Sequence, residues 1–540
     1  MIKKIMQKII DLKKAKSLKV NNSITLQLSD TIQTNKLFEL LSDNIELSSI
    51  PDAFQLLLSN DEKVRLQTAE ILNYVMSTLN STQLVKIDKM FRTRSSLDWN
   101  YDWRSKEPKV LLSHLMSEEE KVTILGLSSF HPNGYFREKS IIALSNMETG
   151  YEIPYILIRL NDWVKEVRNI SKEQLQKYLT PQYALSFINN LPLVLRLVEC
   201  SRDEHLDIIN SVVSILSSAE CSPKLISGLQ STDSKVRLCC YKIILQTRIL
   251  DNISIINYLI KDTNSYNRLF VLKNIQRELT ADEFIDISHL LLHDEFAQIR
   301  VLALEAIYNF KPQGYIDILE KSLFDKNQSV RELSRYLLLK HKKYDFAALY
   351  RDSIEKNEQL YSSICGLGET GNINDSEIIA EFLNSDIIRI VKASINALSR
   401  LDLKGYKEKI IFILNDGRAG ISKIARRVLH KEINVSDADI IYAMFKQAIY
   451  NHVKINTCVL LCSLSKWNAI MYIIEFCDDK DVSISTIGQY ALGNWKLKFN
   501  RSFTNPTKNQ IKEIRKAIIL FGKSIKESDR DFIEFGIRDF

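Results

Sequence analysis

The sequence is poor in residues that interrupt regular structure. Only 15 of its 540 residues are glycine and 9 are proline, and no stretch rich in Gly, Ser or Pro separates domains, which favours one continuous, nearly all-helical chain. The eight cysteines contain no CxxC pair and stand mostly at apolar helical positions, as reduced core thiols do. No run of 18 apolar residues is present and the start lacks the apolar core of a secretory signal, so we expect a cytoplasmic protein without a membrane-spanning helix.

The motifs of common enzyme classes are also missing. The sequence has no Gly-rich phosphate loop, no nucleophile elbow and no HExxH, so it provides no catalytic residue and no cofactor site. His289 and His293 stand four apart, as on one face of a helix, but no third ligand is identifiable and a metal site needs three or four. The net charge of +7 is mild for this length and does not by itself indicate a nucleic-acid partner.

What the sequence does contain is a repeat, illustrated by the apolar anchor Ile299. Arg300 follows it, and small or apolar residues stand four, seven and eight places on at Ala303, Ala306 and Ile307, a spacing that marks one face of a helix. The pattern returns about every 30 residues, with anchors at Val64, Phe136, Val167, His205, Val236, Asn267, Ile299, Val330, Gln359, Ile390, Ile421, Val453 and Ile484. A fixed period of this length predicts a solenoid.

An acidic residue precedes many anchors by five positions and follows an apolar run. Each repeat is therefore predicted to be a helix, a short turn that carries Asp, and a second helix that begins near the anchor. Small residues four places after the anchor allow the helices to pack closely. The turn aspartates are Asp162, Asp262, Asp294, Asp325, Asp416 and Asp479.

This pattern resembles the HEAT-like repeats, particularly the short bacterial form of the phycobilisome lyases. The matching residues are Asp294 with Ile299, Arg300 and Ala303, Asp325 with Val330 and Arg331, Asp162 with Val167 and Arg168, and an expected turn at residues 367–371. The resemblance implies an all-α, right-handed α-solenoid (superhelix) of about fourteen two-helix repeats over residues 51–500. It says little about function, and no motif supports phycobilin lyase activity.

Arginines recur directly after the anchors, at Arg65, Arg137, Arg168, Arg237, Arg268, Arg300 and Arg331. They would align in stacked repeats, so a phosphate-binding stripe is one interpretation. The resemblance implies the interpretation that we prefer, in which a turn Asp pairs bidentately with the Arg that begins the next helix and holds the turn. Val391, Ser422 and Ser485 occupy this position further on, so the turns there must be held differently.

The two ends of the chain differ from the repeats. Residues 1–50 are predicted to form a basic amphipathic helix and a cap, in which the helix either covers the first repeat or binds an anionic membrane surface or an acidic partner. Residues 501–540 are predicted to hold a capping helix from about Asn509 to Lys526 and a tail of alternating charged and apolar residues.

One repeat is irregular near residues 95–108, where Trp99, Tyr101, Trp103 and Arg104 stand in a stretch without helical period. Tyr and Trp are common at recognition surfaces, so these residues are candidates for partner binding. Alternatively, the rings plug the gap left by an imperfect repeat. A family of HEAT-like DNA glycosylases also uses Trp and Asp residues, but the resemblance is one of composition and assigns no catalytic residue.

The most one-sided charge lies between residues 389 and 431. Lys392 and Lys423 both stand two places after their anchors, and Asn396 and Arg427 both stand six places after them, so each pair is expected to lie side by side. The stretch is either a solvated face or a positive strip for phosphate or an acidic protein. The candidate residues of this basic strip are Lys392, Lys423, Arg426 and Arg427.

Together these patterns favour a non-catalytic scaffold or adaptor that binds another protein. The alternative is a nucleic-acid-binding solenoid that uses the basic strip. An enzyme that uses the aromatic segment is a third possibility, supported only by the existence of such enzymes on this fold.

Overall fold

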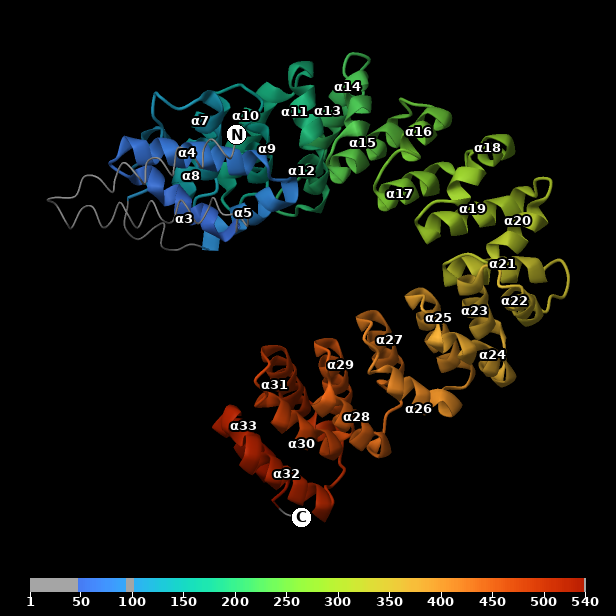
Figure 1. Ribbon diagram of the computed structural model, residues 1–540. Coiled ribbons are helices and arrows are strands. Elements are labelled where there is room, and N and C mark those ends of the chain that lie inside the picture. Colours follow the sequence, from blue (N-terminus) through green and yellow to red (C-terminus); the bar gives the residue numbers. More distant parts are fainter. Residues whose placement is uncertain (1–46, 94–101, 539–540) are drawn as a thin grey trace, which may run out of the picture. The chain divides into compact units, whose positions relative to one another are not determined.

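The protein is helical throughout its described ranges. A computed structural model describes residues 47–93 and 102–538, where every regular element is an α-helix or a 3-10 helix. The chain divides after Thr280 into two compact units, and each unit is a stack of helix pairs (Figure 1). The predicted all-α solenoid class is confirmed.

Unit 1, which ends at Thr280, contains the less regular repeats. Several of its first helices are short and end in a 3-10 turn, as α14 does before residues 228–230. The α-helices of unit 1 are α3 (Ile50–Gln55), α4 (Glu62–Ser77), α5 (Ser81–Thr93), α7 (Glu118–Ser128), α8 (Gly134–Ser145), α9 (Ile153–Arg159), α10 (Lys165–Leu175), α11 (Ala184–Asn189), α12 (Leu191–Arg196), α13 (Leu206–Leu216), α14 (Ser222–Ser227), α15 (Ser234–Thr247), α16 (Asn252–Leu259) and α17 (Ser265–Ile275).

Unit 2, from Ala281 onward, is more regular. The second helices of its repeats, α19, α21, α23, α25, α27, α29 and α31, pack against one another in chain order (Figure 1), and we call them the second-helix layer. The α-helices of unit 2 are α18 (Ala281–Leu292), α19 (Ala297–Phe310), α20 (Tyr315–Ser322), α21 (Gln328–Leu339), α22 (Phe346–Glu355), α23 (Leu360–Thr370), α24 (Ser376–Ala380), α25 (Ile388–Leu401), α26 (Leu403–Ile413), α27 (Ala419–Leu429), α28 (Val435–Gln447), α29 (Asn451–Cys462), α30 (Lys466–Cys477), α31 (Val482–Leu497), α32 (Lys508–Phe521) and α33 (Glu527–Gly536).

The repeat pattern identifies core positions in both units. The anchor Ile299 and the small residue Ala303 are both 0% exposed. The fourth position lies where helices approach closely, because a Cβ added to Gly488 would lie 2.6 Å from the backbone nitrogen of Cys477. Where this position is Ser140, the hydroxyl donates to the carbonyl oxygen of its anchor at 2.6 Å, so the polar atom is satisfied inside the core.

The turn aspartates lie two residues before the N-cap residues of the second helices and hold the turns that lead into them. Asp162 accepts the N–H of Val164 at 2.9 Å, and Asp325 accepts that of Asn327 at 2.7 Å. Each bond satisfies a backbone N–H that lies ahead of the helix and therefore has no carbonyl oxygen within the helix to accept it. The same bond to the residue two places on forms at Asp262, Asp294, Asp416 and Asp479.

Two predictions for the repeat of α23 are wrong. Gln359, expected as a buried anchor, is exposed and precedes α23 with φ of 42°. Residues 367–371 do not form a turn between helices, because α23 continues to Thr370 and ends at Gly371. The glycine at 368 is required by packing, since a Cβ there would lie 2.5 Å from that of Ala397 on α25.

The C-terminal segment holds more helix than expected. The predicted capping helix corresponds to α32, which packs against α30, and a further helix, α33, follows it. The helix predicted at the N-terminus lies outside the described residues. Within the described ranges, no helix combines the length and apolar character needed to cross a bilayer.

Candidate functional site

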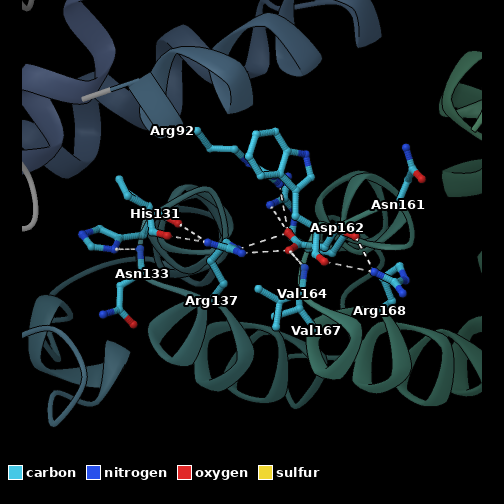
Figure 2. A network of polar contacts seen from close by, with 12 residues as sticks. Arg92, His131, Asn133, Arg137, Asn161, Asp162, Val164, Val167 and Arg168 are labelled. Carbon is cyan, nitrogen blue, oxygen red and sulfur yellow. Dashed lines mark hydrogen bonds and ion pairs between the residues drawn. The ribbon is translucent and has the colours of Figure 1, made fainter. Parts of the chain in front are cut away.

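Four of the seven arginines after the anchors, Arg137, Arg237, Arg300 and Arg331, are buried and act as clamps. Arg137 is 4% exposed and donates from Nε and Nη2 to the two carboxylate oxygens of Asp162, at 3.1 and 2.8 Å. Its Nη1 donates to the carbonyl oxygens of His131 and Pro132 in its own turn. Figure 2 shows the guanidinium lying between the two turns. Since its donors are engaged and buried, Arg137 is not available to a phosphate.

Each clamp joins two successive repeats. Arg300, for example, donates to Asp325 of the following repeat at 2.7 Å and to the carbonyl oxygen of Asp294 in its own turn at 2.6 Å. The expected pairing of an Arg with the Asp of its own turn is therefore wrong. At Asp162, Asp262 and Asp325, the backbone carbonyl accepts from the Arg of the same turn, and the carboxylate accepts from the Arg of the preceding repeat. The other clamps are Arg237 with Asp262 and Arg331 with Glu369.

Other cations replace the clamp where the arginine is lost. Lys454, directly after its anchor, pairs with Asp479 at 2.9 Å. Arg418 donates to both oxygens of Asp416 in its own turn and to the carbonyl oxygens of residues 385–386 in the preceding turn. It therefore also joins two successive turns, but the arginine belongs to the later repeat instead of the earlier one. The repeat pattern did not predict either residue as a clamp, although Lys454 stands at the Arg position directly after the anchor Val453.

Asp162 lies at the centre of a buried ion-pair network in unit 1. Besides Arg137 it accepts hydrogen bonds from Arg92 at 2.9 Å and Arg159 at 2.7 Å, and Arg159 also pairs with Asp88. Burial alone would raise the pKa of Asp162, but the charges of Arg159 and Arg137 hold it at about 2. This carboxylate is ionised and fully engaged, so it is poorly suited to act as a general acid or base.

Trp103 belongs to the core. It is 2% exposed, and its ring centroid lies 4.3 Å from that of His131 and 4.8 Å from that of Phe136. His131 occupies the position of the turn aspartate, and its Nδ1 accepts the N–H of Asn133 at 3.0 Å. A ring this buried cannot contact a partner, so the packing alternative applies to Trp103 and its assignment as a binding residue is wrong.

The rest of the aromatic segment is only partly described. Arg104 is exposed, and its guanidinium carbon lies 4.7 Å from the ring centroid of Tyr135. Trp99 and Tyr101 lie outside the described residues. Of the four candidates of this segment, the structure describes Trp103 as buried and Arg104 as exposed.

His289 lies on α18, and His293 directly follows this helix. His293 Nδ1 lies 2.7 Å from the carbonyl oxygen of His289, so this nitrogen is engaged with the backbone. In the part of the chain that the structure describes, no three His, Cys, Asp or Glu side chains are grouped as metal ligands.

The basic strip retains several cations without acidic partners. Lys392 on α25 reaches α27, where its Nζ lies 2.6 Å from the place of a Cβ on Gly420, one turn before Lys423. Arg427 donates to the Asn396 side chain at 3.3 Å, as expected for equivalent repeat positions. Among the described residues, no carboxylate pairs with Lys392, Lys423, Arg426 or Arg427.

Several other cations of the same stretch are already occupied. Lys407 pairs with Asp437 and Arg418 with Asp416, and Arg389 lies over the ring of Tyr361 at 3.6 Å from its centroid. In the second-helix layer, the cations that remain are Lys392 on α25 and Lys423, Arg426 and Arg427 on α27, while Lys404 and Lys409 of the same stretch lie on α26.

A groove continues this surface toward the C-terminus. It has a volume of about 880 Å³ and is lined by Val459 of α29 and by Ile487 and Tyr490 of α31. Tyr490 is 74% exposed, and His430, which also lines the groove, stands three residues after Arg427. The second-helix layer thus presents cations on α25 and α27 beside an apolar groove at α29 and α31.

Comparison with known proteins supports no assignment of function. No protein-family model and no curated protein matches the sequence. Among solved structures, the chain is similar to Kap95p in the structure with RanGDP, at 12% identity over 91% of this chain and 69% of the other, with a TM-score of 0.29. It is similar to Kap121p bound to Pho4p at 11% identity (99% and 55% covered, TM-score 0.21). It is also similar to a chain in the structure of the Pds5–Scc1 complex, at 13% sequence identity over 94% of this chain and 96% of the other, with a TM-score of 0.21.

Proposed function

We propose that this protein is a non-catalytic scaffold that binds another protein through the second-helix layer of unit 2. The partner supplies an acidic segment that carries a large apolar side chain. The observation behind this proposal is that Lys392, Lys423 and Arg427, which pair with no described carboxylate, lie on the helices of the layer that precede the groove lined by Val459 and Tyr490.

The charges favour an acidic ligand. Opposite charges across an interface speed association and set its register, whereas apolar contacts supply much of the affinity. Lys498 and Arg501 at the far end of the groove also pair with no described carboxylate. A segment with acidic residues on either side of an apolar one would match this order of cations, groove and cations.

The test uses the full chain in three forms. One carries Lys392→Glu, Lys423→Glu and Arg427→Glu. A matched control carries the same charge change at Lys343→Glu, Lys404→Glu and Lys409→Glu, which are exposed and lie outside the second-helix layer. Proteins recovered from host extract after nuclease treatment are identified by mass spectrometry, and the acidic segment of the recovered partner is prepared as a labelled peptide.

Fluorescence anisotropy then measures peptide binding by the three forms. We expect the basic-strip variant to bind at least about tenfold more weakly, mainly through slower association, and the control to bind like the wild type. Equal binding by all three forms would refute the proposal. Duplex DNA and RNA are titrated in parallel, because nucleic acid is the alternative partner. If binding is instead to nucleic acid and the salt slope falls in the basic-strip variant, the alternative is correct.

A further inference from the structure

Trp163 of unit 1 is an exposed indole on a rigid turn. It follows Asp162, whose buried carboxylate accepts the N–H of Val164 at 2.9 Å. The side chain itself is 70% exposed, and the guanidinium carbons of Arg92 and Arg202 lie 5.6 and 5.4 Å from its ring centroid. Cation–π attraction at these distances holds both arginines beside the indole.

A cavity of about 420 Å³ opens next to this ring. Its apolar lining includes Val85 and Ile158, while its polar lining is dominated by cations. The cationic side chains around it are Lys89, Arg92, Arg196 and Arg202.

The acidic side of this cavity is already occupied. Asp88, the one carboxylate among the described residues that line it, is engaged by Arg92 at 3.2 Å and also pairs with Arg159. Lys89, Arg196 and Arg202, by contrast, form no ion pair with a carboxylate of the described ranges. The cavity therefore holds cations that lack an anion, next to an arginine that is fixed in place.

We propose that this cavity binds a small organic phosphate. Arginine side chains donate in pairs to phosphate oxygens. Asp88 and Asp162 hold Nε and Nη2 of Arg92, which fixes its guanidinium and leaves Nη1 for the phosphate, and Arg196 supplies a fork that no described carboxylate occupies. The volume lies in the usual range of small-molecule sites, about 300–1,000 Å³. Val85 and Ile158 provide an apolar wall for the organic part of the ligand. This site belongs to unit 1 and does not depend on the protein-binding surface proposed for unit 2.

Isothermal titration calorimetry of the full chain at low salt tests the site with three probes: inorganic pyrophosphate, AMP and adenosine. The variant Arg196→Gln with Arg202→Gln removes two cations of the cavity. The matched control, Lys273→Gln with Arg277→Gln, removes two exposed cations of the same unit that lie away from the cavity.

We expect AMP and pyrophosphate to bind the wild type and the control equally, and adenosine not to bind. The cavity variant should bind both phosphates about 10- to 100-fold more weakly, because each lost contact is a charge-assisted hydrogen bond. Tighter binding of AMP than of pyrophosphate would place the organic part against the apolar wall, and equal binding would place recognition in the phosphate group. The proposal is refuted if neither phosphate binds up to about 1 mM, or if the cavity variant binds like the control.

Discussion

At the residue scale, arginine is the side chain that can join a turn to its neighbour. Its guanidinium carries five N–H donors in one plane, so Arg300 reaches a carbonyl oxygen of its own turn with Nη1 and the carboxylate of Asp325 with Nε and Nη2. A lysine has a single nitrogen, so Lys454 provides the ion pair with Asp479 without the planar fork.

The clamps differ in how much support each carboxylate keeps when its arginine is removed. Asp262 would keep the side-chain amide of Asn267 at 3.1 Å, whereas Asp162 would keep Arg92 and Arg159. We therefore expect Arg237→Ala to cost about 3–5 kcal/mol of local stability, as for a buried pair that loses one partner, and Arg137→Ala to cost less. Hydrogen exchange of the helices on either side of each clamp measures this cost, and equal losses would contradict the account.

His131 makes unit 1 sensitive to acid. Burial, and then the charge of Arg137, lower its pKa from 6.5 to about 3. Below pH 6.5 the unfolded chain binds a proton that the folded chain excludes, so stability is lost as the pH falls toward 3. At pH 5 this loss is about 2 kcal/mol. Protonation would also turn Nδ1 into a donor and break its bond from the Asn133 N–H.

Thermal melts of the wild type and His131→Asn at pH 7 and pH 5 test this prediction. The variant keeps an acceptor for the Asn133 N–H but loses the ring contact with Trp103, so its melting temperature should be lower at both values. The decrease in melting temperature from pH 7 to pH 5 should be smaller in the variant than in the wild type. His205, whose pKa is also lowered by burial, is present in both proteins and cancels in the comparison. Identical falls would show that His131 does not carry the effect.

At the element scale, the close approach of helices is set by the small residue four places after the anchor. On α31, Gly488 faces the backbone of α30, whereas a Cβ on Gly493 would have no atom within 4 Å. Gly488→Ala should destabilise this pair by about 1–3 kcal/mol through overpacking. Gly493→Ala on the same helix should stabilise it by up to about 1 kcal/mol through helix propensity. Urea titration measures the free energy of unfolding of both variants. If both variants are destabilised or both are stabilised, the assignment of Gly488 to the fourth position after the anchor is wrong.

At the scale of the whole molecule, unit 2 has a core of its own. One continuous cluster of buried apolar side chains extends from Leu304 to Ile537, and each repeat contacts mainly its neighbours. Residues 281–540 expressed alone should therefore fold cooperatively into a helical protein. The fragment should also bind the acidic peptide with the affinity of the full chain, because the basic strip and the groove lie on α25–α31. Circular dichroism measures the folding of the fragment, and fluorescence anisotropy measures its affinity for the peptide. An unfolded fragment would show that unit 2 depends on the rest of the chain.

The sequence by itself determined the fold class and much of the core. Burial of one helix face requires apolar residues at a helical spacing, so Ile299 and Ala303 could be placed inside without a structure. The turn aspartates were equally predictable, because their hydrogen bond is local. The basic strip was partly predictable, since residues at equivalent repeat positions lie side by side, as Asn396 and Arg427 do.

Only the tertiary structure decided which groups meet between repeats. Which carboxylate each arginine binds depends on how far neighbouring turns are displaced from one another. The spacing of residues within one repeat does not determine this displacement. Trp103 could not be placed because its segment has no helical period, and its burial follows from contact with His131 and Phe136. The cavity beside Trp163 combines α5, α9 and α12 with two turns. Such a site arises from helix packing, whereas a repeat pattern specifies only which face of each helix is buried.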